Sequence, residues 1–443
     1  MTNSPSTRVV LHIGAPKTGT SYLQLMLWRN RRALARQGVH VPGKRMMDHF
    51  QAGRDVLERK RPPTHPLPPW DGAFDELLAE IRRSGAHTGV ISCEDFSLAT
   101  PDQVERTFAR LDGFAVDVVY GTRSFARQLT SQWQESVKNF NRRDLPEWLA
   151  DIRRRDPSEG FWMFNDVPAI VERWKPPSGR FHVVTVPGRN ASDDEIWRRF
   201  LQAVGTQPRR TARVRRLNES LGYVEASLLV RVQSHLPRQA PVVRIRNVVK
   251  GFLVLQALAG RPDQVPITLP PSDRAWVDEE TARRRETLRR DDVELLGDLG
   301  DLDVLPTSFG ELSLEERGSD VFALTRASLA ALLAFEDRQR STLRWLEAAS
   351  HMGGTATDLV DAIREVVDYR TPVVRRRHYR AAADEKLAAA AVTAADPVAV
   401  LDAGGEMLAA LLLGQARRSV RIDELVGPGQ PALFRRIATL IGR

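Results

Sequence analysis

The residues of this chain best suited to bind an anion lie in one short loop. The loop Gly14–Ser21 contains one lysine and three hydroxyl residues. It follows the apolar run Val9–Ile13, which predicts a buried strand, and leads into Ser21–Gln37, whose apolar spacing predicts a helix. A tight loop between a strand and a helix N-terminus directs backbone N–H groups and the positive end of the helix dipole at one point. The segment therefore predicts a binding site for a phosphate or sulfate group.

A second anion-binding pattern lies later in the chain. Arg123 follows the predicted strand Val116–Tyr120, and Ser131 lies eight residues further on, in the predicted helix Ala126–Phe140. A guanidinium can bind a phosphate through two parallel hydrogen bonds, and a serine hydroxyl near a helix start adds another donor. Ligands of a doubly wound sheet bind at the carboxyl ends of its strands, which is where both patterns are expected.

Three residues come into question as a general base for an acceptor hydroxyl. Glu94 follows the predicted strand Gly89–Ser92, between the two anion-binding patterns, and a nearby polyanion would raise the pKa of its carboxyl group. The same carboxylate could instead cap a turn or pair with an arginine. His49 is the second candidate, with a packed or surface histidine as the alternative. His12 lies inside the first strand and is expected to be a core histidine.

The order of residues in the loop resembles that of one known family. A Walker A loop places its lysine after the closing glycine, whereas here Lys17 precedes Gly19. The run Pro16-Lys17-Thr18-Gly19-Thr20-Ser21 instead resembles the 5′-phosphosulfate loop of sulfotransferases, which use 3′-phosphoadenosine 5′-phosphosulfate as donor and release 3′,5′-adenosine bisphosphate. The resemblance covers residues 8–205 and continues more weakly to residue 306, where the sequence looks like the closing segment of actinobacterial-type sulfotransferases.

The resemblance implies a role for each matched residue. Lys17 would contact the bridging oxygen and the leaving phosphate, and Glu94 or His49 would act as the base. Tyr22 stands where many members have an aromatic residue stacked on adenine, although a core tyrosine is equally expected there. The 3′-phosphate would be held by Arg123 and Ser131, and the 5′-phosphosulfate by Pro16, Lys17, Thr18, Gly19, Thr20 and Ser21.

The chain also departs from the family pattern. It has no good counterpart of the late arginine-lysine-glycine segment that closes over the 3′-phosphate in cytosolic members. The basic stretch Pro208–Arg216 is either an arginine lid or an exposed loop. Asp298 and Asp301 lack the His or carboxylate cluster that a metal site would need, and the family's reaction requires no metal because lysine, arginine and N–H groups stabilise the charge.

Composition limits the class of protein. The chain has 443 residues, a net charge of +9 and a pI near 10.1, which fits a polyanionic ligand. No zinc-finger spacing or aromatic-rich RNA-binding signature is present, so nucleic acid is not the expected partner. The single Cys93 fits a reducing compartment. No signal peptide is evident, and the apolar run Met407–Leu413 is too short to cross a bilayer, so we expect a cytoplasmic protein without a transmembrane segment.

Alternating strand and helix patterns predict an α/β fold, a doubly wound parallel sheet with flanking helices of the P-loop-NTPase-like sulfotransferase type. We expect a sulfotransferase domain over 1–306, with a motif-bearing core at 8–205, and a helical C-terminal region over 307–443 that could form a homo-oligomer. The further strand expected is Phe181–Val186. Further helices are expected at Phe74–Arg83, Gln103–Leu111, Asp194–Val204, Val321–Phe335, Ala356–Val367, Ala381–Thr393 and Met407–Gln415, with Gly353-Gly354, Gly404-Gly405 and Pro428-Gly429 as separators.

Three functions remain open at this point. The first is a sulfotransferase with a saccharide, glycolipid or small hydroxylated metabolite as acceptor. The second is an ATP-dependent P-loop phosphotransferase, for which Glu94-Asp95 could hold magnesium. The third is a non-catalytic nucleotide-binding scaffold that has kept the fold and lost the base. The fold alone does not choose among them.

Overall fold

The computed structural model describes residues 7–60, 70–156, 160–188, 191–192, 194–208, 211–212, 214, 220–240, 242–261, 264–314, 317–352, 373–393 and 395–426. The chain divides into two compact units. Unit 1 comprises Met1–Gln132, Pro146–Leu217 and Thr268–Glu311, and unit 2 comprises Trp133–Leu145, Asn218–Ile267 and Leu312–Arg443. The boundary expected at residue 306 lies near the last point at which the chain passes from unit 1 to unit 2, between Glu311 and Leu312. Two earlier segments, however, belong to unit 2 rather than to the expected domain 1–306.

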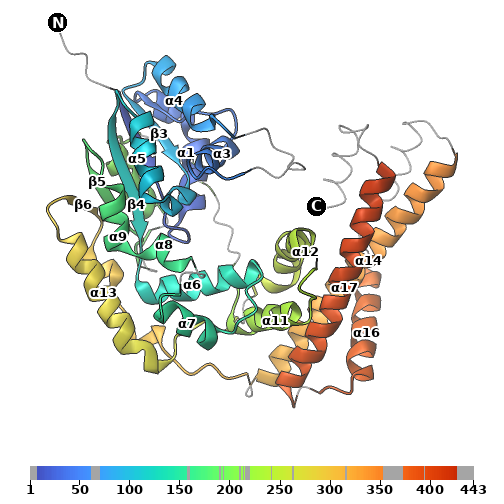
Figure 1. Cartoon of the computed structure of the whole chain (residues 1–443). Helices are drawn as coiled ribbons and strands as arrows, with labels where there is room; N and C mark the ends of the chain where they lie inside the picture. Colours follow the sequence, from blue (N-terminus) through green and yellow to red (C-terminus); the bar gives the residue numbers. More distant parts are fainter. Residues whose placement is uncertain are drawn as a thin grey trace, which may run out of the picture. The chain divides into compact units, whose positions relative to one another are not determined.

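Unit 1 is built on a six-stranded, wholly parallel sheet in the order β2-β3-β1-β4-β5-β6, of which β3, β4, β5 and β6 are labelled in Figure 1. The four inner strands confirm the predicted ones, and their near-continuous apolar runs are typical of a sheet covered on both faces. The two edge strands are missing from the prediction because β2 has only two residues and β6 is only partly buried. The strands are β1 Arg8–His12, β2 Val39–His40, β3 Thr88–Ser92, β4 Ala115–Thr122, β5 Phe181–Thr185 and β6 Val293–Leu296.

The strand register brings three chemically important segments to one edge of the sheet. β1 lies between β3 and β4, and its last residue, His12, is paired with Ser92 on β3 and with Val119 on β4. All three strands run in the same direction. The loop after His12, the residues after Ser92 and the end of β4 therefore emerge side by side at the carboxyl edge.

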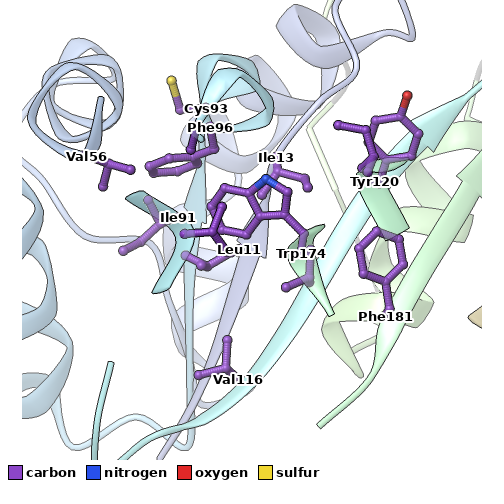
Figure 2. Close-up of a cluster of buried hydrophobic side chains, with 14 of the residues drawn as sticks. Leu11, Ile13, Val56, Ile91, Cys93, Phe96, Val116, Tyr120, Trp174 and Phe181 are labelled. Atoms are coloured by element: carbon purple, nitrogen blue, oxygen red, sulfur yellow. The ribbon is translucent and has the colours of Figure 1, made fainter. Parts of the chain in front are cut away.

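Helices cover both faces of the sheet, as expected for a doubly wound fold. One hydrophobic cluster lies between the sheet and α3, α4, α5, α9 and α13, and Figure 2 shows part of it around Leu11, Phe96 and Trp174. A second cluster joins the opposite face to α1, α2 and α10. The helices are α1 Thr20–Arg29, α2 Arg31–Ala35, α3 Met47–Val56, α4 Ala73–Ser84, α5 Pro101–Arg110, α6 Phe125–Lys138, α7 Leu145–Arg153, α8 Phe161–Asn165, α9 Val167–Trp174, α10 Glu195–Val204 and α13 Arg274–Leu288; the short 3₁₀ turns are η1 Glu94–Leu98, η4 Pro271–Asp273, η5 Leu299–Leu302 and η6 Pro306–Ser308. The part of α6 from Trp133 onward and the first residue of α7 belong to unit 2.

The first predicted helix, Ser21–Gln37, is interrupted at Asn30. The backbone of Asn30 leaves the helical region (φ −101°, ψ 10°), and its side-chain Nδ2 donates to the carbonyl of Met26 at 2.8 Å. An asparagine side chain that bonds the preceding turn competes with the continuing helix. The segment is therefore two helices, α1 and α2.

Unit 2 is helical, as expected for the C-terminal part of the chain. The predicted helix Ala356–Val367 and the glycine and proline pairs at 353–354 and 428–429 lie outside the described residues. The separator expected at Gly404-Gly405 is wrong, because both glycines lie inside one long helix. A Cβ on Gly404 would come within 2.1 Å of the Thr325 side chain, so these glycines allow close helix packing rather than a break. The elements are α11 Tyr223–Ser234, α12 Val242–Val248, the π-helical η3 Val249–Leu258, α14 Gly318–Met352, α16 Val373–Ala389 and α17 Pro397–Val426.

One helix of unit 2 bears on the expectation of no transmembrane segment. In the part of the chain that the structure describes, the stretch Pro397–Arg421 of α17 alone has the length and hydropathy that could cross a membrane. Leu401, Leu408 and Leu412 on this helix are buried within unit 2. A core helix of a soluble protein has the same composition, so this finding is weak evidence for a membrane span.

Candidate anion-binding and catalytic site

The loop after β1 is packed tightly onto the end of β4. The N–H of Ala15 donates to the carbonyl of Gly121 at 3.1 Å, and the N–H of Gly121 donates back to the carbonyl of Gly14. A side chain at Gly121 would collide with the loop, because a Cβ there would lie 2.6 Å from Thr18 Oγ1. Lys17 and Gly19 have left-handed backbone conformations, with φ values of 67° and 88°. Such residues curve the backbone into the N–H-lined concavity that binds anions.

Side chains from within unit 1 engage three successive carbonyl groups of this loop. Because the carbonyls are bonded inward, the peptide units of the loop are held in one orientation. Two of the donors come from the residues that follow β4, so the loop and β4 form one rigid assembly. The bonds run from Thr18 Oγ1 to Ala15 (2.6 Å), from Gln128 Nε2 to Pro16 (3.0 Å) and from Arg123 Nη1 to Lys17 (2.9 Å).

The first turn of α1 has the features of an anion-binding helix end. Gly19 is the N-cap and contributes no side-chain cap, and the first turn contains no acidic residue. The helical hydrogen bonds begin with the N–H of Leu23, which donates to the carbonyl of Gly19 at 3.0 Å. The N–H groups of Thr20 and Ser21 therefore have no acceptor within the helix and can bind an anion.

The hydroxyl residues and the tyrosine of the loop differ in exposure. Thr18 and Thr20 are buried at 2% and 4% exposure, whereas Ser21 is exposed to solvent. Tyr22 is half-buried and packs against the cluster formed by α1, α2 and α10. This position favours the core role for Tyr22 over stacking on adenine.

Glu94 lies directly beside the loop, at the start of η1. A Cβ on Gly14 would meet the Glu94 carbonyl oxygen at 3.2 Å, and the Glu94 Oε2 accepts a hydrogen bond from Gln24 Nε2 of α1 at 2.7 Å. Burial raises the pKa of the Glu94 carboxyl group, while hydrogen bonds from its own backbone N–H and from Gln24 oppose that rise. A half-buried carboxylate with a raised pKa suits a general base near neutral pH.

The two histidines both serve to fix the end of β3. His49 Nε2 donates to the Pro42 carbonyl at 2.9 Å, and its Nδ1 accepts from the Ser92 N–H at 3.1 Å. His12 Nδ1 lies 2.7 Å from Ser92 Oγ. Burial lowers the pKa of both rings, that of His12 to about 4. Both nitrogens of His49 are engaged in the neutral form, so neither is available to take a proton from an acceptor hydroxyl, which favours Glu94 as the base. His12 has the core position that the sequence predicts.

The second anion-binding pattern is only partly brought together. Arg123 contacts the loop through its bond to the Lys17 carbonyl. Ser131 lies six residues beyond the start of α6, about 9 Å along its axis, and none of the described residues hydrogen-bonds to its hydroxyl. Ser124 is a residue that the sequence analysis missed. It is 2% exposed at the N-terminus of α6, and its buried Oγ has no partner among the described residues. A serine just before a helical pattern was the available signal.

Gln24 and Gln128 are also missing from the predicted site. Gln24 contacts Glu94, and Gln128 Nε2 bonds both the Pro16 carbonyl and Asn165 Oδ1, at 3.0 and 2.8 Å. Polar residues on a helix carry no sign of which way they point, so the sequence offered no signal for either glutamine.

The basic stretch Pro208–Arg216 is described only in part, and its arginines lie outside the described residues. Within it, the backbone of Ala212 is bonded to the Asn30 side chain through its N–H at 2.6 Å and its carbonyl at 3.2 Å. Asn30 follows the last residue of α1, about 15 Å from the anion-binding end of that helix. The described anchor of this segment is thus remote from the loop.

Asp298 and Asp301 have structural roles at the end of β5. Asp298 caps η5 by accepting from the Gly300 N–H, and Asp301 accepts from Thr185 Oγ1 at 2.7 Å and forms an ion pair with Arg199. Across the described ranges, no group of three or more His, Cys, Asp or Glu side chains is arranged to hold a metal ion.

Comparisons with other proteins neither support nor oppose an assignment. No protein-family model, curated protein or solved structure matches this chain. The function must therefore be argued from the arrangement of residues at the carboxyl edge of the sheet.

Proposed function

We propose that this protein is a sulfotransferase with the family's P-loop-like fold, which moves a sulfuryl group from 3′-phosphoadenosine 5′-phosphosulfate to an acceptor hydroxyl. One observation carries the proposal. The ends of three adjacent strands bring together the lysine loop, the carboxylate of Glu94 and the guanidinium of Arg123. A phosphate-binding loop, a base and a second phosphate-binding group are the parts that this transfer requires.

The loop is suited to a donor with two separate anionic groups. Its N–H groups and Lys17 would bind the 5′-phosphosulfate. Arg123, which already bonds the loop, would bind the 3′-phosphate with the buried hydroxyl of Ser124. A guanidinium has five N–H donors, so one bond to the Lys17 carbonyl is compatible with a bond to phosphate. The unpartnered hydroxyl of Ser124 fits an anionic ligand better than it fits a closed core.

The residues at this edge would each perform one part of the transfer. The acceptor oxygen forms a bond to sulfur while the bond between sulfur and the bridging oxygen breaks. The acceptor proton passes to the Glu94 carboxylate, and the electron pair of the broken bond stays on the 5′-phosphate of the product. Lys17 and the N–H groups of the first turn of α1 stabilise that charge as it develops.

The proposal extends to the setting of the reaction. The acceptor would be a small or carbohydrate hydroxyl compound in the cytoplasm, and the helices of unit 2 could mediate self-association. The ATP-dependent alternative would use Glu94-Asp95 for magnesium. Asp95, however, is engaged by Arg54 at 3.3 Å, which leaves this pair less suited to a cation.

The test is calorimetric binding of 3′,5′-adenosine bisphosphate, compared with ATP–Mg. The proteins are the wild type, Lys17→Ala, Arg123→Ala and, as the matched control, Arg29→Ala at the exposed far end of α1. We expect micromolar binding that prefers the bisphosphate. Loss of a charged phosphate contact at Lys17 or Arg123 should weaken it by about 1.5–3 kcal/mol, or roughly 10- to 150-fold in Kd.

The control should bind as the wild type does. A preference for ATP–Mg, or no binding of either nucleotide, would overturn the sulfotransferase proposal. Bisphosphate binding by a protein that transfers no sulfuryl group to any of a broad set of hydroxyl acceptors would favour the scaffold alternative.

A further inference from the structure

Gln24 connects the anion-binding end of α1 with the proposed base. Its Nε2 donates to Glu94 Oε2 at 2.7 Å and lies 3.4 Å from the carbonyl oxygen of Ser92. Gln24 is four residues beyond Thr20, so the two side chains leave the same face of the helix. One short helix thus offers N–H groups to an anion in its first turn and holds a carboxylate from its second.

We propose that Gln24 is a positioning residue that holds Oε2 of Glu94, so that Oε1 is the oxygen that takes the acceptor proton. The reaction it serves is the proposed function, but the contact itself does not depend on that function. The strand end beside Gln24 is rigid, because His12 and His49 both bond to Ser92. A glutamine held between a fixed strand end and a carboxylate restricts the carboxylate to one orientation.

Gln24 also acts on the charge of the base. Burial favours the neutral form of Glu94 and raises its pKa, and neighbouring Asp95 adds to that rise. The hydrogen bond from Gln24 acts in the opposite direction, because an N–H donor stabilises the ionised carboxylate. Charged groups on the segments around Glu94 include Asp95 on η1, Arg54 on α3, Arg173 on α9 and Lys17 in the loop.

The experiment follows the titration of Glu94 by NMR in protein labelled with ¹³C at the glutamate carboxyl groups. The resonance is identified by its loss in Glu94→Gln. Gln24→Met keeps the length of the side chain and removes the donor, so the pKa of Glu94 should rise. Gln24→Lys replaces the neutral donor with a cation, so the pKa should fall below that of the wild type. Leu25→Ala, on the exposed side of α1, should leave the titration unchanged.

Activity provides the second measurement. In Gln24→Met we expect the acidic limb of the kcat profile to move to higher pH and kcat at neutral pH to fall about tenfold or more, with KM for the donor within about twofold. In Gln24→Lys the limb should move to lower pH. A purely structural role would change the thermal stability of both variants without opposite shifts in the two profiles.

The outcomes separate this inference from the proposed function. If folded Gln24→Met and Gln24→Lys both titrate Glu94 as the wild type does, Gln24 does not hold the base and the inference is wrong. If the pKa of Glu94 rises in Gln24→Met and falls in Gln24→Lys but the wild type binds no bisphosphate, the role of Gln24 toward Glu94 stands and the sulfotransferase proposal fails.

Discussion

Gly121→Ala tests whether the anion loop is packed onto β4 as the structure describes. A Cβ at this position would lie 2.6 Å from Thr18 Oγ1, 3.2 Å from Thr18 Cβ and 3.3 Å from the Gly14 carbonyl oxygen. The threonine hydroxyl cannot move away freely, because it donates to the Ala15 carbonyl at 2.6 Å. Overpacking of this kind costs about 1–3 kcal/mol, which the protein can absorb only by unfolding more easily or by displacing the loop.

Urea unfolding and bisphosphate calorimetry together measure that cost. We expect Gly121→Ala to lose about 1–3 kcal/mol of unfolding free energy, or to bind the bisphosphate roughly tenfold or more weakly, or to show part of each. Gly188→Ala is the matched control, because a Cβ there would meet nothing within 4 Å and its backbone is not in the positive-φ region.

A double variant makes the test specific to the contact. Thr18→Ala removes the oxygen that the new Cβ would strike, so the combined variant should be less impaired than the sum of the two single variants by at least about 0.5 kcal/mol. Strict additivity, or a Gly121→Ala protein with wild-type unfolding and binding, would refute the described packing of the loop.

Two further predictions follow from burial of charged groups. Because the pKa of Glu94 is raised in the folded protein, the unfolding free energy falls as the pH rises through that pKa, so Glu94→Gln should be more stable than the wild type at pH 7 but not near pH 4. Urea unfolding at the two pH values measures this difference, and exposed Glu105→Gln should leave the unfolding free energy unchanged at both. A Glu94→Gln variant that is less stable than the wild type at pH 7 would contradict the prediction. Burial lowers the pKa of His12 to about 4 from an ordinary 6.5, so the unfolding free energy should fall by on the order of 3 kcal/mol as the pH decreases from 6.5 to 4. If His12→Gln loses the same unfolding free energy over this pH range, another group is responsible.

The sequence was sufficient for the parts of the fold that depend on local pattern. The inner strands and the helices α4, α5, α6 and α10 agree with their predicted positions to within a few residues. The break at Asn30 and the unbroken helix at Gly404-Gly405 could not be predicted from the sequence, because each depends on the contacts that a residue makes in the folded protein. Asn30 bonds a preceding carbonyl, and Gly404 faces Thr325 of another helix.

The same distinction holds for the candidate site. The parallel-strand rule was enough to place the loop, Glu94 and Arg123 at one edge, since all three follow strands. It could not separate Glu94 from His49 as the base. That choice depends on the orientation of the His49 ring, whose two nitrogens bond Pro42 and Ser92.

The anion loop depends on residues far outside the segment that carries its motif. Gln128, which bonds the Pro16 carbonyl, is held by Asn165, and the carbonyl of Asn165 accepts from Arg284 Nη2 at 2.7 Å. Arg284 is 3% exposed and lies 4.3 Å above the Phe125 ring, and burial lowers the pKa of its guanidinium to about 10.

A buried arginine that holds a backbone carbonyl is costly unless the surrounding contacts are complete. Both α13, which carries Arg284, and the edge strand β6 come after residue 270. The segment 8–205 therefore contains the predicted chemistry but not the support of its loop, and both lie within unit 1.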